Sequence, residues 1–214
     1  MTLPGTVQPA EPFPPPGPQV GVVVYPGVNE LELGVMLGLL LGVTLPGTVG
    51  TPDSAALTLA RTRGSLLSAG GLVLTPQLAF AAAPSLAAVL VPGGTGAQKA
   101  GRDPALQALL TAARSARIPV GACGSGLLVL GEAGLLEGRE VGCPGPLTDT
   151  VWGYRPAHLE PDAPVSDRQA GTGPLFTGPG GLDALHLTLA VAGEVWPADQ
   201  LRDAAARVGA RSGS

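Results

Sequence analysis

The chain has 214 residues, 45% of them apolar, which is enough for one domain with a single large core. Glycine (33) and proline (23) are abundant but follow no fixed period, which argues against a collagen-like chain. With a formal net charge of −4 and only 12 basic residues, the chain offers no basic stripe for a phosphate backbone, so nucleic acid is not expected as a partner.

Residues 1–19 are rich in proline and are expected to form a flexible N-terminal extension, because this composition favours extended chain and cannot bury a core. The start lacks the basic and apolar regions of a secretory signal. The longest apolar stretch, 31–43, is too short to cross a bilayer. We therefore expect a cytoplasmic protein with no membrane partner. In that reducing compartment Cys123 and Cys143 are expected to be free thiols.

The domain predicted for residues 20–210 alternates short apolar runs, typical of buried parallel strands, with helical segments. Strands are expected at 20–25, 87–91 and 118–122, with short strands of a hairpin or meander inside 55–78. Helices are expected at 31–43, 104–117, 124–133, 182–192 and 199–208. Strands that alternate with helices predict an α/β fold with a parallel sheet and helices on both faces. Residues 141–181 show no sustained period and receive no prediction.

Two helix starts carry recognisable caps. Asn29, followed three residues later by Glu32, predicts an N-cap with a carboxylate that reaches back toward it. Asp103 and Pro104 are the preferred cap and first residue of a second helix.

The segment 120–126 reads Val-Gly-Ala-Cys-Gly-Ser-Gly and places Cys123 at a strand-to-helix junction among small residues. A nucleophile raised on such a strained turn needs small neighbours. Amides and a helix terminus beside the sulfur would favour the thiolate, so the pKa of Cys123 is expected below about 8.5. Cys123 should then react faster than Cys143. The alternative is a small buried cysteine that only packs.

Around this junction the sequence resembles the DJ-1/PfpI superfamily. Residues 118–123 and 127–139 look like that family's elbow and following helix, closest to the branch of isonitrile hydratases and the amidotransferase-like domains of AraC-type regulators. Three further segments agree with it in the right order: 20–33, 88–94 and 176–187.

The resemblance implies a flavodoxin-like three-layer sandwich with a mostly parallel central sheet, in a homodimer. It places Cys123 at the family's nucleophile, Glu32 at the acidic residue that touches it, and Gly93 and Gly94 on the facing loop. Amides near Gly94 and Gly124 would stabilise developing charge. Glu32 would move a proton, or would merely complete the cap begun at Asn29. Gly34 and Gly38 form a flat strip on an apolar helix, which also favours a dimer.

Several residues depart from the family pattern. Pro144 stands where catalytic members usually have a histidine, and Gly124 replaces the threonine that follows the nucleophile in the isonitrile-hydratase branch. Of the two histidines, His186 is expected to pack inside a core helix, whereas His158 either folds over the elbow or is solvated.

No metal site is expected, because two cysteines and two histidines show no ligand spacing, and no cofactor is expected. The leading hypothesis is a cysteine-dependent hydratase or hydrolase of a small molecule such as an isonitrile, which uses Cys123 and Glu32. The alternative is a non-catalytic protein that senses a metabolite or oxidation at Cys123. A regulator's sensor domain is disfavoured, since no helix-turn-helix segment follows residue 210.

Overall fold

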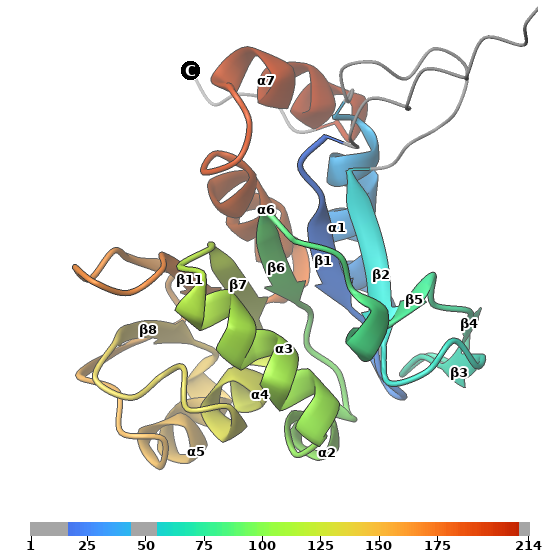
Figure 1. Ribbon diagram of the computed structural model, residues 1–214. Coiled ribbons are helices and arrows are strands. Elements are labelled where there is room, and N and C mark those ends of the chain that lie inside the picture. The colour runs from blue at the N-terminus through green and yellow to red at the C-terminus, as the bar shows by residue number, and fades with distance from the viewer. Residues whose placement is uncertain (1–16, 44–54, 210–214) are drawn as a thin grey trace, which may run out of the picture.

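The computed structural model describes residues 17–43 and 55–209, so the expected extension at 1–19 lies almost entirely outside the described residues. The centre is a seven-stranded sheet in the order β10-β11-β7-β6-β1-β2-β5 (Figure 1). All neighbours in it are parallel except β10, which is antiparallel to β11. The strands are β1 (Val20–Val23), β2 (Ala56–Ala60), β5 (Leu78–Ala79), β6 (Ala88–Val91), β7 (Val120–Cys123), β10 (Val165–Asp167) and β11 (Leu175–Gly178).

The central strands are buried along their whole length. Every residue of β1, β6, β7 and β11 is buried, as expected for a parallel sheet that is covered on both faces. The strands predicted at 20–25, 87–91 and 118–122 are confirmed, with ends shifted by one or two residues. The expected hairpin is also present as β3 (Leu66–Leu67) paired with β4 (Val73–Leu74).

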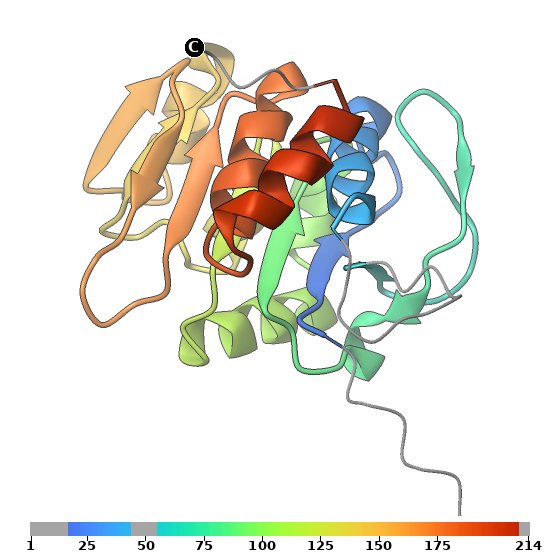
Figure 2. The same cartoon turned by 90° about the horizontal axis from the view of Figure 1, so that it is seen from above.

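Helices cover the sheet on both sides, so the predicted α/β three-layer architecture is confirmed. Helices α1 (Glu30–Leu41), α6 (Ala184–Ala192) and α7 (Ala198–Arg207) pack together on one face. The other face carries α2 (Ala97–Gly101), α3 (Pro104–Ser115) and α4 (Gly126–Glu132). Figure 2 shows α3 across the sheet from α1, α6 and α7. No helix within the described ranges is long and apolar enough to cross a membrane.

The stretch 141–181, which the sequence left unassigned, contains part of a second small sheet. In it, β8 (Glu140–Cys143) pairs in parallel with β9 (His158–Pro161), and the short helix α5 (Thr148–Trp152) lies between them in the chain. Three short 3-10 turns complete the elements: η1 (Phe80–Ala82), η2 (Gly145–Leu147) and η3 (Gly181–Asp183).

The glycines of α1 differ from the expected flat strip. The close approach occurs at Gly42, where an added Cβ would lie 2.9 Å from the Cα of Ala204 in α7. Gly38 faces Val208 of the same chain, and an added Cβ at Gly34 would meet nothing within 4 Å among the described residues. The strip is therefore partly covered by the chain's own C-terminal helix.

One edge of the sheet gathers the loops that matter for function. Strands β1, β6, β7 and β11 are parallel, so their carboxyl ends meet there, next to the first turns of α1 and α4. In open α/β sheets this edge is where ligands bind.

Candidate functional site

The predicted strand-to-helix turn exists, but its left-handed residue is Gly124. Cys123 is the last residue of β7, and Gly124 has a φ of +56°. Only glycine adopts this left-handed conformation without a steric penalty from Cβ. The prediction that Cys123 itself occupies the strained position is therefore wrong by one residue. The reason is physical: β7 continues one residue further than the apolar run suggests, because Cys123 still pairs with Gly178 of β11.

Cys123 lies in the core beside Glu32. Its side chain is fully buried, and Sγ donates a hydrogen bond to Oε2 of Glu32 over 3.2 Å. Burial raises the pKa of the thiol strongly, the charge and hydrogen bond of Glu32 raise it further, and the Gly93 amide opposes this only in part. The expected lowering of the Cys123 pKa is therefore wrong, and the group is a neutral thiol at pH 7.

Glu32 joins the start of α1 to three strand ends. Glu32 is only 3% exposed, but its carboxylate oxygens accept several hydrogen bonds from the protein. Oε2 accepts from the Gly93 amide over 2.5 Å as well as from the thiol, and Oε1 accepts from the Gly181 amide over 2.9 Å. A buried carboxylate needs such partners, because an unpaired one costs several kcal/mol. The contact between an acidic residue and the cysteine is thus present.

The cap of α1 is supplied by Asn29. Its side-chain oxygen accepts from the amides of Leu31 and Glu32, as predicted. The Glu32 carboxylate reaches the side-chain amide of Asn29 at 3.4 Å, whereas the backbone amide of Asn29 donates to the Gly93 carbonyl. Glu32 therefore does not close a reciprocal capping box; it is turned toward the sheet.

The three amides expected to stabilise negative charge all have protein partners. The Gly93 amide donates to Glu32, the Gly94 amide donates to Oγ of Ser125 over 2.8 Å, and the Gly124 amide donates to the Gly178 carbonyl over 3.1 Å. A substrate oxyanion would have to displace one of these acceptors. Gly94 also needs to be glycine, because an added Cβ would overlap the Gly27 carbonyl.

Ser125 is a site residue that the sequence reading treated only as a small neighbour. Its hydroxyl accepts from the Gly94 amide and donates to the Gly94 carbonyl, both over 2.8 Å, and so fixes the loop after β6 against the start of α4. Its place directly after the elbow glycine was the available signal.

An open cleft of about 420 Å³ lies over this cluster. Cys123 is not among the described residues that line it. The lining residues are Asn29, Glu32, Ala69, Gly94, Thr95, Gln98, Ser125 and Leu128. The cleft thus presents carboxylate, amide and hydroxyl groups and no lysine or arginine. Glu32 therefore borders the cleft, whereas the buried Cys123 does not.

Neither histidine reaches this cluster. His158 is exposed and pairs with Glu160 on β9. His186 lies on the solvent side of α6 near Asp183, so the prediction that it packs in the core is wrong. Its neighbours in the sequence are small or apolar, so their pattern does not indicate which face of α6 it occupies. Cys143 is buried elsewhere, with its sulfur 3.8 Å from the Thr148 hydroxyl, and both cysteines are free thiols.

Comparison with known proteins places these features in context. No protein-family model matches the chain. Isonitrile hydratase of Pseudomonas putida is 31% identical over 179 residues, which span 83% of this chain and 72% of that protein. Among solved structures, DJ-1beta of Drosophila melanogaster matches with a TM-score of 0.76 at 17% identity, over 92% of this chain and all of its own. A ThiJ/PfpI family protein of Pseudomonas syringae matches with a TM-score of 0.73 at 23% identity, over all of this chain and 84% of its own.

Proposed function

Because this chain belongs to the DJ-1/ThiJ/PfpI superfamily and is related to isonitrile hydratase, we propose that it binds a small neutral molecule in the cleft over Glu32 and Ser125, without covalent attachment to Cys123. One observation carries the proposal. The strained turn, from which a nucleophile would project, is occupied by Gly124, and a Cβ built there would lie 3.0 Å from Oε1 of Glu32. The turn position nearest Oε1 of Glu32 therefore has no side chain, and Oε2 is met by the Cys123 thiol.

The thiol next to it is poorly suited to replace the missing group. Cys123 is fully buried, and a thiol attacks only as its thiolate. Deprotonation would place a second negative charge 3.2 Å from the Glu32 carboxylate in a desolvated site. This thiol serves instead as a hydrogen-bond donor that helps to hold Glu32.

The lining groups favour a neutral ligand that carries an amide or a hydroxyl group. Gln98 offers a side-chain amide and Thr95 a hydroxyl, whereas the Asn29 side chain already caps α1. The only charged group among the lining residues is the Glu32 carboxylate, which would repel an anion. Simple amides match this set, because they donate and accept at adjacent atoms.

A second candidate function, favoured by the 31% identity to isonitrile hydratase, is the hydration of an isonitrile. In the route that uses Cys123, the S–H adds to the terminal carbon, so that sulfur and a proton bond to it and a thioimidate forms. Water then displaces the thiol, and the products are an N-substituted formamide and the free cysteine. Glu32 would carry the proton. This route requires the sulfur to reach the cleft.

One experiment separates the two candidates. The purified chain is mixed with n-butyl isonitrile or with N-butylformamide, and proton NMR follows both the formyl signal and saturation transfer to the formamide. Binding without conversion supports the first proposal, provided that Gln98→Trp, which fills the cleft, abolishes it and the exposed Arg202→Trp control does not. Conversion that disappears in Cys123→Ser supports the second. Neither binding nor conversion would overturn both.

A further inference from the structure

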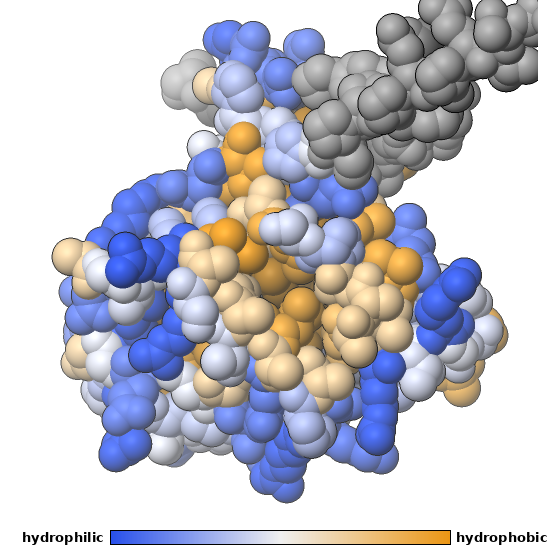
Figure 3. All heavy atoms as spheres, in the orientation of Figure 1, coloured by the Kyte–Doolittle hydropathy of each residue, from blue (hydrophilic) through white to orange (hydrophobic). Residues whose placement is uncertain are grey.

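A second cavity, of about 400 Å³, shares no described lining residue with the cleft over Glu32. It lies at the carboxyl ends of β1 and β2, between η1 and the starts of α2 and α3. Figure 3 views the molecule from this side and shows apolar residues gathered around a hollow. The volume falls within the range of small-molecule sites.

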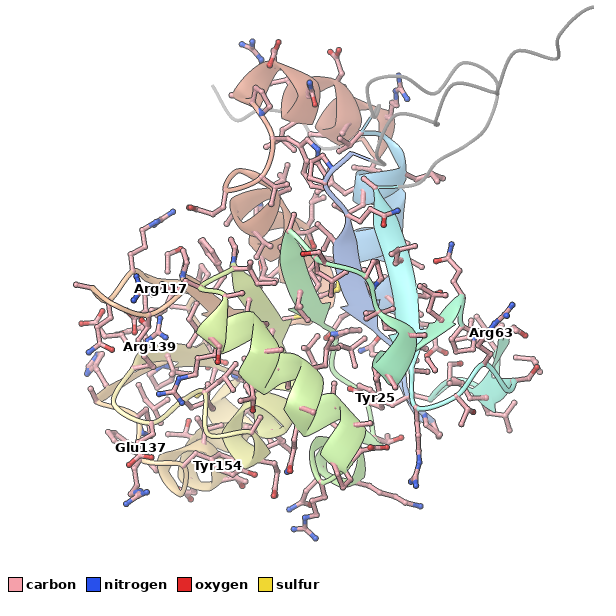
Figure 4. All side chains as sticks on the ribbon, in the orientation of Figure 1. Tyr25, Arg63, Arg117, Glu137, Arg139 and Tyr154 are labelled. Atoms are coloured by element: carbon pink, nitrogen blue, oxygen red, sulfur yellow. The ribbon has the colours of Figure 1, made fainter. Side chains whose placement is uncertain are left out.

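The floor of the cavity is apolar and partly aromatic. Tyr25, Phe80 and Leu106 are buried residues that line it, and Figure 4 shows Tyr25 beside the η1 segment. The whole chain has only three phenylalanines and two tyrosines, so two aromatic rings at one cavity are a notable concentration. Rings and leucine side chains favour a ligand with a flat or branched apolar body.

Tyr25 forms the wall between this cavity and the site of Glu32. Its hydroxyl donates to the Pro92 carbonyl over 2.6 Å and is therefore fixed. Burial raises the pKa of Tyr25, and the nearby Glu32 and Cys123 raise it further, so the hydroxyl stays protonated and closes the wall. The two sites are neighbours that share no lining residue within the described part of the chain.

The rim is cationic although the chain as a whole is acidic. Arg61, Lys99 and Arg102 line the cavity, and Asp103 is the only carboxylate among the lining residues. Arg61 lies 3.6 Å from Asp103, and Arg102 pairs with Glu132 outside the cavity at 3.4 Å. Lys99, the only lysine of the chain, has no ion pair among the described residues. Lys99, a cation beside an apolar cavity and without an ion-pair partner in the described ranges, is suited to bind the carboxylate of a ligand.

We propose that this cavity binds a small organic acid, with its carboxylate on Lys99 and its apolar body against Tyr25, Phe80 and Leu106. The ligand's carboxylate would pair with Lys99, which has no other ion-pair partner among the described residues. The ligand's apolar body would be removed from water and buried against the apolar floor. The site is independent of the cleft over Glu32.

Calorimetric titration with benzoate tests this site, with benzamide as the neutral probe of the same shape. Saturable binding of benzoate is expected, at least tenfold tighter than that of benzamide and weaker at higher salt. Lys99→Glu should weaken benzoate binding at least tenfold. The exposed Arg202→Glu in α7 makes the same charge change away from the cavity and should alter it less than twofold.

Three results would overturn the proposal. The first is the absence of saturable benzoate binding, and the second is an equal loss of benzoate affinity in Lys99→Glu and Arg202→Glu. The third is a loss of benzoate affinity in Gln98→Trp that Lys99→Glu does not show. The last result would place benzoate in the cleft over Glu32. Circular dichroism and urea midpoints of each variant show that the fold is intact, so a loss of binding reports on the cavity.

Discussion

Sγ of Cys123 lies 3.2 Å from Oε2 of Glu32, and Cys123 is not among the described residues that line the cleft. The same carboxylate accepts hydrogen bonds from the backbone amides of Gly93 and Gly181, in the loops after β6 and β11. The thiol is therefore one of several hydrogen-bond donors around a buried charge. A donor in this position stabilises Glu32 only while it keeps its proton. The chemistry expected of Cys123 therefore changes from nucleophile to structural hydrogen-bond donor.

The first prediction concerns thiol reactivity in the unmodified chain. Cys123 and Cys143 are both fully buried, and burial raises the pKa of each. We predict that neither reacts with iodoacetamide or a disulfide reagent within minutes at pH 7.5, and that both react once urea unfolds the chain. Mass spectrometry of the modified peptides measures each site. Rapid labelling of Cys123 in the folded chain would restore the original expectation of a reactive centre.

Glu32→Gln should lower the free energy of unfolding by about 2 to 4 kcal/mol, because an amide nitrogen would face a backbone N–H and leave buried donors unpaired. Urea unfolding followed by circular dichroism measures this change. Glu30→Gln, two residues earlier in the same first turn of α1, is the matched control and should change stability by less than about 1 kcal/mol. If both variants lose only this small amount, Glu32 acts through the helix and not through the strand loops.

A buried ion pair between Arg139 and Asp167 predicts a pH dependence of stability. Nε of Arg139 donates to Asp167 over 2.7 Å, and both side chains are almost fully buried (Arg139 is labelled in Figure 4). Burial alone would raise the pKa of Asp167, but hydrogen bonds from Arg139 and from the amides of Glu140 and Gln169 outweigh it and lower the pKa below 3.8. The resulting stabilisation is present above about pH 4 and is lost as the pH falls through the lowered pKa.

Asp167→Asn should therefore cost about 3 to 5 kcal/mol at pH 7, since it leaves Arg139 without its counterion. The difference from the unmodified chain should shrink between pH 4 and pH 2. Urea midpoints at several pH values measure it, with the exposed Asp199→Asn in α7 as control. A difference that stays constant down to pH 2 would contradict the lowered pKa.

The expected homodimer remains a prediction. Leu31 is 50% exposed and Leu41 63% exposed, at the two ends of the α1 face on which Gly34 is open. We propose that a second copy packs against this face. Light scattering at micromolar concentration should give the mass of two chains, and Gly34→Arg should give the mass of one. A monomer before any substitution would refute the pairing.

Much of this fold could be predicted, because its signals are local. Continuous apolar runs marked β1, β6 and β7, and side-chain caps marked the starts of α1 and α3. Strands β8 to β11 could not be found, because prolines, glycines and charged residues interrupt this stretch and leave no continuous apolar run like those of β1, β6 and β7. His186 was misplaced because α6 is apolar on nearly all sides, so its pattern does not indicate a solvent face.

The sequence correctly predicted a sharp turn between β7 and α4, but it assigned the central residue of that turn to Cys123 instead of Gly124. The small residues at 121–126 are compatible with a sharp turn at more than one position, and the turn was assigned to Cys123 because it carries the reactive side chain. The usable signal was the glycine: of the residues at the junction, Gly124 follows directly on the strand and takes a positive φ without strain. The partners of Glu32 lie 61, 91 and 149 residues away in the chain, and no local pattern reveals such contacts.

The central claim is that the residue of the strand-to-helix turn nearest Oε1 of Glu32 is Gly124, so that no thiol of the described residues opens into the cleft. The most direct measurement is the intact mass of the chain after treatment with iodoacetamide at pH 7.5, comparing Cys123→Ala with Cys123→Ala/Gly124→Cys, which differ in the thiol at position 124. A side chain at this φ costs about 1 to 2 kcal/mol, and circular dichroism monitors that the fold is retained. The account predicts that one label adds to the double variant, at a rate that the neighbouring Glu32 carboxylate keeps below that of a free cysteine, and that none adds to Cys123→Ala. Equal, slow labelling of the two variants, together with rapid labelling of Cys123 in the unmodified chain, would contradict it.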